Sequence, residues 1–333
     1  MESLVSIVIT NYNGLKHLKE CFNSLYNLNY QNFEIIFVDN NSQDKSVEFI
    51  KFNYPKVKII QNDEDYGFSG ANNIGALKAK GKYIVLLNID TIVNENWIIE
   101  LVKIAESSKD VGIVASKQFF YYNRDLMFYA GGRCDKYGKS AHIGENKKDN
   151  KYLNKNRKTF YACGAGMLIK RALYERIGLF DPLYYAYSED FDLSWRAWLS
   201  GYKVIYSPKS FLYHKIGQIL GSISPFKQFL AERNKLRTLL KNYELKTLIK
   251  ILPIYIGKRI GMILLLMSRF DTKAIIFIYI YIKALFWNIF HFRSLITDRK
   301  FIQNLRNKDD KFIMNLMNYT TSLDTFIKKS LIF

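Results

Sequence analysis

Short aliphatic and β-branched runs alternate with helical patterns through the first two hundred residues, and this alternation restricts the fold more than any other feature. Four strand patterns come first, at residues 5–10, 34–38, 57–60 and 83–87. Stretches with apolar residues at helical spacing separate them. Strand–helix–strand order of this kind predicts an α/β fold with a mainly parallel central sheet and right-handed crossovers.

Polar turn residues follow three of these four runs. Asn11 opens an Asn-Tyr-Asn turn after the first run, Asp39 follows the second, and Asp90 closes an Asn-Ile-Asp turn after the fourth. Open parallel sheets bind their ligands beyond the carboxyl ends of the strands. The sequence therefore predicts a site at that edge of the sheet.

The middle of the chain is less regular. Residues 133–158 are polar, basic and rich in Asn, and they predict a loop with little regular structure. Residues 160–169 form a strand pattern in which Gly164 and Gly166 allow a close approach of the backbone. Further predicted elements are a helix at 188–200 and short strands at 203–206 and 211–213, the last followed by His214.

The positive charge is concentrated in the last third of the chain. The formal net charge is +19, and residues 225–333 hold 20 Lys and Arg against 7 Asp and Glu. From Pro225 onward the sequence has helical character, with predicted breaks near Pro253, Asp271 and Thr297. We therefore expect two domains, an α/β domain over residues 1–224 and a basic, apolar helical region over residues 225–333.

The C-terminal region is apolar and aromatic as well as basic. Residues 274–292 are apolar apart from Lys283, Asn288 and His291, and at about 1.5 Å per residue they are just long enough to cross about 30 Å of hydrocarbon. A Lys in mid-span costs roughly 2.5–3.5 kcal/mol on insertion scales. This favours helices lying in the interface of an anionic membrane surface. The alternative is a soluble helical subdomain that covers the sheet or forms a homodimer.

Charge and cysteine content bound the partners and the compartment. A nucleic-acid-binding protein would explain the basic charge but not the acidic residues at strand ends, so no nucleic-acid partner is predicted. Cys21, Cys134 and Cys163 are too few and too scattered for a disulfide framework or a zinc site, which favours a reducing compartment. No signal-peptide pattern precedes the first strand. We expect a peripheral or monotopic protein at the cytoplasmic face of the cell membrane.

Each candidate site residue has two interpretations when taken alone. Asp90 at a strand end suits a hard cation, but it could equally cap the next helix. Glu189, Asp190 and Asp192 could be catalytic, or they could complement a helix dipole in its first turn. His214 could be a metal ligand or an ordinary surface or core residue.

Two further features are equally ambiguous alone. Asp39 could be a turn former. The segment GFSGANN at residues 67–73 could be an ordinary glycine-rich helix start. Neither decides the function.

Taken together and in order, the motifs resemble a known family. They are VSIVITNYN at 5–13, VDNNS at 38–42, GF at 67–68, NNIG at 72–75, LNIDT at 87–91, GLFD at 178–181, SED at 188–190, Arg196, GY at 201–202, YH at 213–214 and RN at 233–234. From about Val5 to Asn234 the chain resembles the family 2 glycosyltransferases. It looks most like the bacterial and archaeal branch that contains rhamnosyltransferases and galactofuranosyltransferases. The resemblance implies a nucleotide-sugar-binding, GT-A-type fold and a catalytic domain over residues 1–224.

The resemblance also implies roles for residues that would bind the donor. Thr10 and Tyr12 resemble the positions that line the nucleobase, where a Tyr ring can stack. Asp39 resembles the acid that accepts a hydrogen bond from a pyrimidine N–H or from the ribose. The other implied donor-binding positions are Gly67, Asn72, Asn88 and Gly164.

The remaining implied roles concern the metal and the proton. Asp90 is the second carboxylate of the family's Asp-x-Asp motif, in which Asn88 replaces the first, and His214 resembles a further ligand of Mg²⁺ or Mn²⁺. Asp190 resembles the catalytic base, and Glu189 resembles a residue that contacts the acceptor. A metal that neutralises the leaving diphosphate and a base that deprotonates the acceptor hydroxyl suit a single displacement, which inverts the anomeric centre.

The sequence thus predicts an inverting, metal-dependent glycosyltransferase of cell-surface polysaccharide biosynthesis. The expected donor is a UDP- or dTDP-linked sugar, and the expected acceptor is a hydroxyl of a glycan or a lipid-linked glycan. Two alternatives remain, a non-catalytic sugar- or nucleotide-binding module and a basic nucleic-acid-binding protein. A processive synthase is disfavoured because the sequence has no Gln-x-x-Arg-Trp motif.

Overall fold

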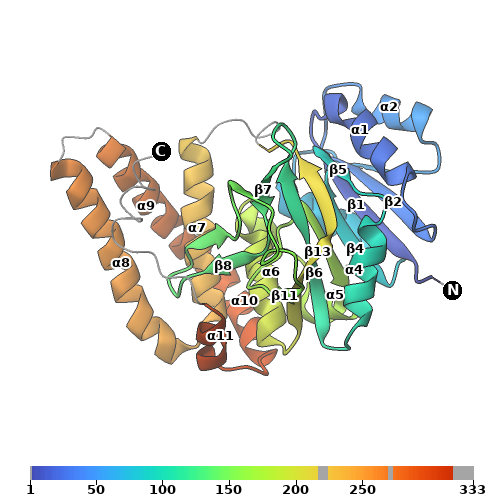
Figure 1. Ribbon diagram of the computed structural model, residues 1–333. Helices are drawn as coiled ribbons and strands as arrows, with labels where there is room; N and C mark the ends of the chain where they lie inside the picture. Colours follow the sequence, from blue (N-terminus) through green and yellow to red (C-terminus); the bar gives the residue numbers. More distant parts are fainter. Residues whose placement is uncertain (1, 217–223, 269–272, 318–333) are drawn as a thin grey trace. The chain divides into compact units, whose positions relative to one another are not determined.

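The computed structural model describes residues 2–216, 224–268 and 273–317, and the chain forms two compact units (Figure 1). The sheet unit comprises Met1–Gly132, His142–Tyr185 and Glu189–Gly221. The helical unit comprises Arg133–Ala141, Ala186–Ser188 and Ser222–Phe333. The helical unit therefore takes in two short segments that lie far before residue 225 in the sequence.

The first half of the sheet unit follows the predicted alternation of strands and helices. Its elements are β1 (Val5–Asn11), α1 (Leu15–Tyr26), β2 (Phe33–Asp39), α2 (Ser46–Asn53), β3 (Lys58–Gln61), α3 (Gly67–Lys78), β4 (Tyr83–Asn88), β5 (Thr91–Val93), α4 (Trp97–Glu106) and β6 (Val111–Phe120). The later elements are β7 (Leu126–Tyr129), β10 (Lys147–Lys148), β11 (Arg157–Lys158), β12 (Gly166–Lys170), α5 (Arg171–Ile177), the 3₁₀ turn η1 (Pro182–Tyr184), α6 (Glu189–Leu199) and β13 (Lys203–His214).

The central sheet has eleven strands among the described residues, with a main order of β10-β7-β6-β12-β4-β1-β2-β3. β1 is parallel to β2 and to β4, and β2 is parallel to β3. β12 runs antiparallel between β4 and β6, whereas β13 is parallel to β6 and antiparallel to β5. The predicted α/β fold is confirmed, and its sheet is mixed because β12 reverses the strand direction in the middle.

Alternate residues of the buried strands face opposite layers of helices. Ile7 and Ile9 of β1 belong to a large apolar cluster that includes Phe22 of α1 and Trp97 of α4. Val8 faces the other way, toward α3, where a Cβ added to Gly75 would lie 2.4 Å from its Cγ1. The period-two alternation of a strand and burial on both faces explain why β1 is apolar throughout.

The predicted loop at residues 133–158 contains regular structure. β8 (Gly132–Cys134) and β9 (Ser140–His142) form a two-stranded sheet, β10 pairs with β7, and β11 pairs with β13. The turn between β8 and β9 is closed by Asp135, whose Oδ1 accepts hydrogen bonds from the backbone N–H groups of Tyr137 and Lys139. Most of the segment is irregular, as predicted, but these short strands were not predicted because they have no periodicity that a sequence pattern can reveal.

The strands also differ from the prediction in three respects. The strand predicted at 160–169 begins only at Gly166, because the preceding residues turn toward α6. The strands predicted at 203–206 and 211–213 are one strand, β13, with an irregular register between Ser207 and Phe211. β6 lies beside both β12 and β13 but is not among the predicted strands.

The helical unit is built from α7 (Pro225–Asn242), α8 (Leu245–Ser268), α9 (Lys273–Phe290), α10 (Phe292–Asn304) and α11 (Asp310–Leu316). The break predicted near Pro253 is wrong, since α8 continues through this residue. Proline lacks the N–H that would bond to the carbonyl of Ile249, but Ile249 is exposed, so water can reach that carbonyl. The break predicted near Thr297 is also wrong, because its hydroxyl donates to the carbonyl of Arg293 within α10. Asp271 lies outside the described residues.

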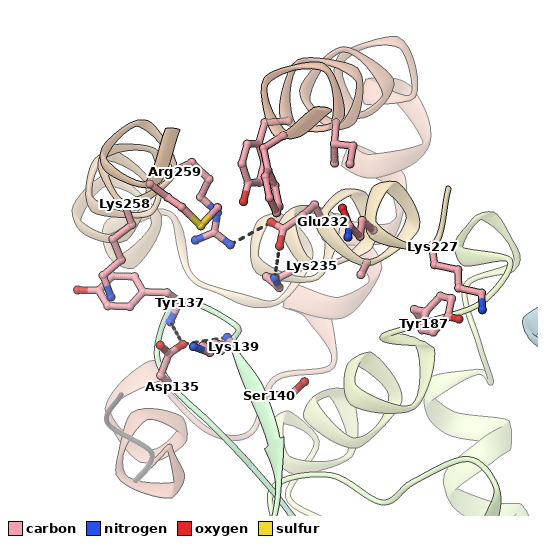
Figure 2. A pocket seen from close by; sticks show the side chains of 16 residues that line it. Asp135, Tyr137, Lys139, Ser140, Tyr187, Lys227, Glu232, Lys235, Lys258 and Arg259 are labelled. Carbon is pink, nitrogen blue, oxygen red and sulfur yellow. Dashed lines mark hydrogen bonds and ion pairs between the residues drawn. The ribbon is translucent and has the colours of Figure 1, made fainter. Parts of the chain in front are cut away.

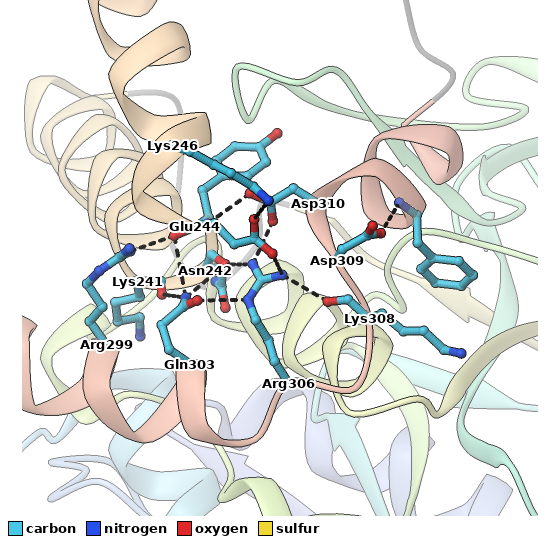
Figure 3. A network of polar contacts seen from close by, with 12 residues as sticks. Lys241, Asn242, Glu244, Lys246, Arg299, Gln303, Arg306, Lys308, Asp309 and Asp310 are labelled. Atoms are coloured by element: carbon cyan, nitrogen blue, oxygen red, sulfur yellow. Dashed lines mark hydrogen bonds and ion pairs between the residues drawn. The ribbon is translucent and has the colours of Figure 1, made fainter.

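The carboxyl end of α7 is held by side chains of the later helices (Figure 3). Arg299, Gln303 and Arg306 donate hydrogen bonds to carbonyl oxygens of residues 240–243, at distances of 2.5–3.4 Å. The last carbonyls of a helix lie at the negative end of its dipole, so these donors satisfy hydrogen bonds there and the two arginines also complement the dipole. Part of the C-terminal positive charge is thus used inside the unit.

Two stretches of the helical unit have the length and composition of membrane-crossing helices. Among the described residues, α8 is long and apolar enough to cross a membrane, and 22% of its most apolar stretch is buried. α9 and α10 reach this length only together, and they are bent by 72° relative to each other. The bend divides the apolar stretch that was predicted as continuous over 274–292.

We predict that Gly67→Ala destabilises the sheet unit by about 1–3 kcal/mol, measured as the free energy of unfolding in urea. Gly67 has φ of +66°, and an added Cβ would lie 2.6 Å from the backbone oxygen of Tyr185. Leu77→Ala on the same helix, where the side chain is 70% exposed, is the control and should change stability by no more than about 0.5 kcal/mol. Equal stability of the two variants would contradict the close packing at Gly67.

Candidate active site

The register of the parallel strands gathers the predicted site residues at one edge of the sheet. Asn11 at the end of β1 is paired with Asp39 at the end of β2, and Thr10 is paired with Asn88 at the end of β4. His214 at the end of β13 is paired with Thr91, the residue that follows Asp90. The predicted edge therefore carries side chains from four strands.

Asp90 and His214 lie against each other in a buried position. Nε2 of His214 is 3.2 Å from Oδ1 of Asp90, and both side chains are less than 10% exposed. The two atoms lack the alignment of a hydrogen bond. Burial acts to raise the pKa of Asp90, but the neighbouring imidazoles, first His214 and then His17, act to lower it, and this pKa lies below its usual value. Asp90 is therefore held as a carboxylate.

Gln118 of β6 orients the imidazole of His214. Its Oε1 lies 3.2 Å from Nδ1 of His214 and accepts a hydrogen bond from Nδ1–H, which directs Nε2 at Asp90. The same Oε1 lies 3.9 Å from the thiol of Cys163. An arrangement in which one ring nitrogen is fixed and the other is directed at a carboxylate is typical of metal-binding histidines.

The first turn of α6 contains three acidic residues with different environments. Asp192 is fully buried and forms an ion pair with Arg196 at 2.9 Å. Oδ2 of Asp190 accepts a hydrogen bond from the backbone N–H of Gly164 at 3.0 Å. Glu189 is 7% exposed, and its Oε2 has no hydrogen-bond partner among the described residues.

These environments separate the acid–base properties of the two neighbouring carboxyls. Burial and the charge of Asp190 raise the pKa of Glu189 well above its usual value. Burial also raises the pKa of Asp190, but hydrogen bonds from backbone N–H groups, including that of Gly164, oppose the shift. Asp190 is therefore the member of the pair that ionises first, and Glu189 retains its proton.

A three-residue segment connects the two halves of the site. Cys163 contacts Gln118, Gly164 donates to Asp190, and the carbonyl of Ala165 accepts from the backbone N–H of Asn88 at 3.1 Å. Residues 163–165 thus touch the partner of His214, the carboxylate of α6 and the strand that leads to Asp90. The prediction that placed Gly164 beside the donor sugar did not foresee this contact with Asp190.

Asp39 is engaged in its own loop. It is 2% exposed, and it accepts hydrogen bonds from Asn11 at 2.7 Å and from the hydroxyl and backbone N–H of Ser42 at 2.6 and 2.9 Å. A carboxylate has about four acceptor positions, so Oδ2 has capacity left. Tyr12 lies just past β1 with 44% of its surface exposed, and Thr10 is partly buried.

The other predicted donor-binding residues fall into three situations. Gly67 begins α3, and its carbonyl accepts from Asn40 at 3.1 Å. Asn72 is buried on α3 and donates to the carbonyl of Phe68 in its own helix. Oδ1 of Asn88 is buried and has no hydrogen-bond partner among the described residues. Gly166 serves packing, since an added Cβ would lie 2.3 Å from Leu212.

The sequence reasoning missed two residues of this region, Gln118 and His17. Gln118 lies in β6, which was not predicted, although a Gln within an apolar stretch is a usable signal. His17 of α1 is 4% exposed, neither ring nitrogen has a hydrogen-bond partner among the described residues, and burial lowers its pKa. It lies on the buried face of α1, next to Leu18, where the apolar spacing gives no signal for a single polar residue.

We predict that Glu189→Gln gains stability relative to the wild type as the pH rises. Because its pKa is raised in the folded state, Glu189 contributes stability that is full below about pH 4.3 and is lost above it. Gln stays neutral at every pH, so the difference in unfolding free energy should grow between about pH 4.5 and 8, by at most about 1.4 kcal/mol per pH unit. Urea unfolding across this range measures it.

The control for this prediction is Glu175→Gln, which changes an exposed carboxylate on α5. Its stability should run parallel to that of the wild type at every pH. A parallel course for Glu189→Gln as well would mean that Glu189 is ionised in the folded protein.

Comparison with known proteins identifies the family of the chain. The model of glycosyl transferase family 2 matches residues 6–178, which is just over half of the chain. This stretch includes Asp39 and Asp90 but ends before Asp190 and His214.

Two curated relatives come from Streptococcus pneumoniae serotype 4. Glycosyltransferase GlyG is 35% identical over 132 residues, which cover 39% of this chain and 44% of the relative. Glycosyltransferase GlyA is 27% identical over 228 residues, which cover 67% of this chain and 32% of the relative. The chain thus spans less than half the length of either relative.

Solved structures share the fold at low sequence identity. One is GalNAc-T7 with UDP, GalNAc and Mn²⁺, with a TM-score of 0.59 and 22% identity over 74% of this chain and 49% of the other. Another is the mannosyltransferase PcManGT from Pyrobaculum calidifontis in complex with GDP-Man and Mn²⁺, with a TM-score of 0.53 and 15% identity over 92% of this chain and 86% of the other. These neighbours have the GT-A-type fold that the sequence predicts. The extent of the family match shows that the chain belongs to glycosyl transferase family 2.

Proposed function

We propose that this protein is an inverting, metal-dependent glycosyltransferase. It transfers a sugar from a nucleotide-diphosphate-sugar to a hydroxyl of a glycan or lipid-linked acceptor. The observation that carries the proposal is the arrangement of Asp90, His214 and Asp190, in which a buried carboxylate faces an imidazole and a second carboxylate is held by Gly164. Such a site has the groups needed to bind a cation and to accept a proton.

The donor atoms around Asp90 suit a hard divalent cation such as Mg²⁺ or Mn²⁺. Oδ1 of Asp90 and Oδ1 of Asn88 are buried without hydrogen-bond partners among the described residues, and Nε2 of His214 faces the first of them. Carboxylate, amide and imidazole groups are ordinary ligands of these ions. The described residues contain no group of three or more His, Cys, Asp and Glu that could hold a metal by themselves. Ligands from the diphosphate of the donor would complete the coordination.

Asp190 would act as the base. As the acceptor hydroxyl attacks the anomeric carbon, its proton passes to Asp190 and the bond from that carbon to the diphosphate oxygen breaks. A divalent cation held by Asp90 and His214 would supply electrostatic stabilisation of the charge that develops on the diphosphate. Attack on the face opposite the leaving group inverts the configuration. Glu189 retains its proton and is positioned beside Asp190, where it would contact the acceptor as a hydrogen-bond donor.

The donor would bind along the carboxyl ends of β1, β2 and β4. Tyr12 offers an exposed ring for stacking on a base, and Asp39 has acceptor capacity for a ribose hydroxyl or a pyrimidine N–H. The structure of GalNAc-T7 contains UDP, and that of PcManGT contains GDP-Man. We favour a UDP- or dTDP-linked donor because the resemblance of Asp39 to the family's acid implies a pyrimidine.

The helical unit would dock on the cytoplasmic face of an anionic membrane. α8 exposes one apolar face and α9 exposes another, each with helical spacing. These outer apolar faces consist of Ile249, Ile256, Ile260, Leu264 and Met267 on α8, and of Ile275, Tyr279, Ile282, Phe286 and Phe290 on α9. Exposed apolar side chains that recur along one face of a helix are typical of an interaction site. A lipid-linked acceptor, and a role in cell-surface polysaccharide synthesis, would account for it.

We predict that Asp190→Asn and Asp90→Asn separate the two halves of the site. Asp190→Asn should keep Mn²⁺-dependent binding of UDP, measured by calorimetry, while sugar transfer falls by about 10²-fold or more. Asp90→Asn should lose the effect of Mn²⁺ on nucleotide binding. Before the variants are compared, the donor is identified by testing a panel of nucleotide sugars for release of diphosphate. The matched control is Glu189→Gln, which should keep more transfer activity than Asp190→Asn; the reverse order would move the base to Glu189.

We predict that Phe286→Ser combined with Phe290→Ser reduces flotation of the protein with anionic vesicles. Burying one Phe side chain is worth roughly 1.5–3 kcal/mol, so the loss of two should lower partitioning by more than about tenfold. Phe52→Ser is the control, because Phe52 lies on α2 of the sheet unit and is 87% exposed. Unchanged flotation of the double variant, or an equal loss with Phe52→Ser, would argue against docking through α9.

A further inference from the structure

The helical unit encloses a cavity that none of the predicted site residues lines (Figure 2). Its volume is about 430 Å³, within the range of about 300–1,000 Å³ typical of ligand pockets. Segments of the helical unit form its walls: the β8–β9 turn, Tyr187, α7, α8 and α9. We call it the α7–α9 pocket.

The pocket has more basic than acidic side chains. Its ionic residues are Lys139, Lys227, Lys235, Lys258 and Arg259, with Asp135 and Glu232 as the acids. Asp135 closes the β8–β9 turn by accepting backbone hydrogen bonds. Glu232 is shared between Lys235 at 2.5 Å and Arg259 at 3.0 Å (Figure 2). Both acids are therefore engaged within the wall.

Two cationic groups of α8 remain incompletely satisfied. The ammonium of Lys258 lies 3.6 Å from the centre of the Tyr137 ring, and among the described residues no carboxylate lies within ion-pair distance of it. Burial lowers the pKa of Lys258. Nε of Arg259 is buried and has no hydrogen-bond acceptor within the described residues. An anion in the pocket would satisfy both groups.

The remaining wall of the pocket is apolar. Met262 of α8 and Phe277, Ile280 and Tyr281 of α9 line it. Met262 and Phe277 pack in one apolar cluster with Tyr281 against it. An inorganic phosphate or a sugar would make no apolar contact with this wall. An anion attached to a hydrocarbon chain would contact both the cationic groups and the apolar wall.

From this division of the pocket we infer that it binds one anionic membrane lipid. The phosphate would contact Lys258 and Arg259, and the first part of the chain would lie against Phe277 and Ile280. The same helices carry the outer apolar faces, so a lipid could enter from the bilayer beside them. This inference rests on the proposed membrane docking, and it adds a specific lipid site to a non-specific surface.

The test uses the full-length protein and soluble short-chain lipids below their micelle concentration. Dioctanoyl phosphatidic acid should bind, measured by calorimetry, at least about tenfold more tightly than dioctanoyl phosphatidylcholine or inorganic phosphate. Lys258→Met removes the ammonium and its cation–π contact with Tyr137 while keeping most of the apolar side chain, and it should weaken binding of phosphatidic acid by about tenfold or more. Hydrogen exchange in α8 and α9 of the wild type should slow when this lipid is added.

The matched control is Lys250→Met, which removes the same charge from an exposed position on the same helix. It should leave binding unchanged. Equal losses in both variants, or equal binding of inorganic phosphate or of phosphatidylcholine, would overturn the assignment. Flotation with vesicles separates the two proposals: a protein that floats but does not bind dioctanoyl phosphatidic acid lacks the lipid site, and one that binds this lipid but does not float lacks the docking surface.

Discussion

The contact between Asp90 and His214 is the interaction on which the rest of the site depends. A carboxylate that is 4% exposed requires a partner, and its partner lies more than a hundred residues away in the sequence. The contact exists only because β13 runs beside both β5 and β6, which places His214 opposite Thr91. The mixed sheet is thus what allows one strand end to meet another at the edge where parallel strands already gather polar residues.

The segment of residues 163–165 links this contact to α6, and it does so through small side chains and backbone groups. A side chain at Gly164 would have to share space with the ring of Phe68, 3.0 Å from the added Cβ. Glycine at this position lets the backbone lie close to both Phe68 and Asp190. Three consecutive residues therefore fix Gln118, Asp190 and Asn88 relative to one another. A rigid arrangement of this kind favours catalysis, because the groups need little reorganisation during reaction.

The predictable part of the fold is the part that local patterns describe. Strands such as β1 and β4 are buried on both faces and read as continuous apolar runs, whereas β6 carries the buried polar residues Lys117 and Gln118 and escapes recognition. Lys117 is tolerated there because Asp149, from the segment predicted as a loop, pairs with it at 2.6 Å. The candidate site divides in the same way: the position in the motif favours Asp190 over Glu189 as the base, but the N–H of Gly164 that holds Asp190 is distant in sequence and no local pattern indicates it.

The charge of the C-terminal region shows how composition can mislead about a surface. Arg237, Arg299 and Arg306 are directed into the helical unit, where they bind acidic side chains and helix carbonyls. Exposed cations such as Lys250, Lys283 and Lys300 are fewer than the sequence total suggests. Exposed apolar side chains on the outer faces of α8 and α9 are more numerous than these cations. Burying one of them in a bilayer contributes more binding free energy than one screened surface charge. If the unit meets a bilayer, hydrophobic burial must therefore supply most of the binding, and the exposed charges select the anionic leaflet.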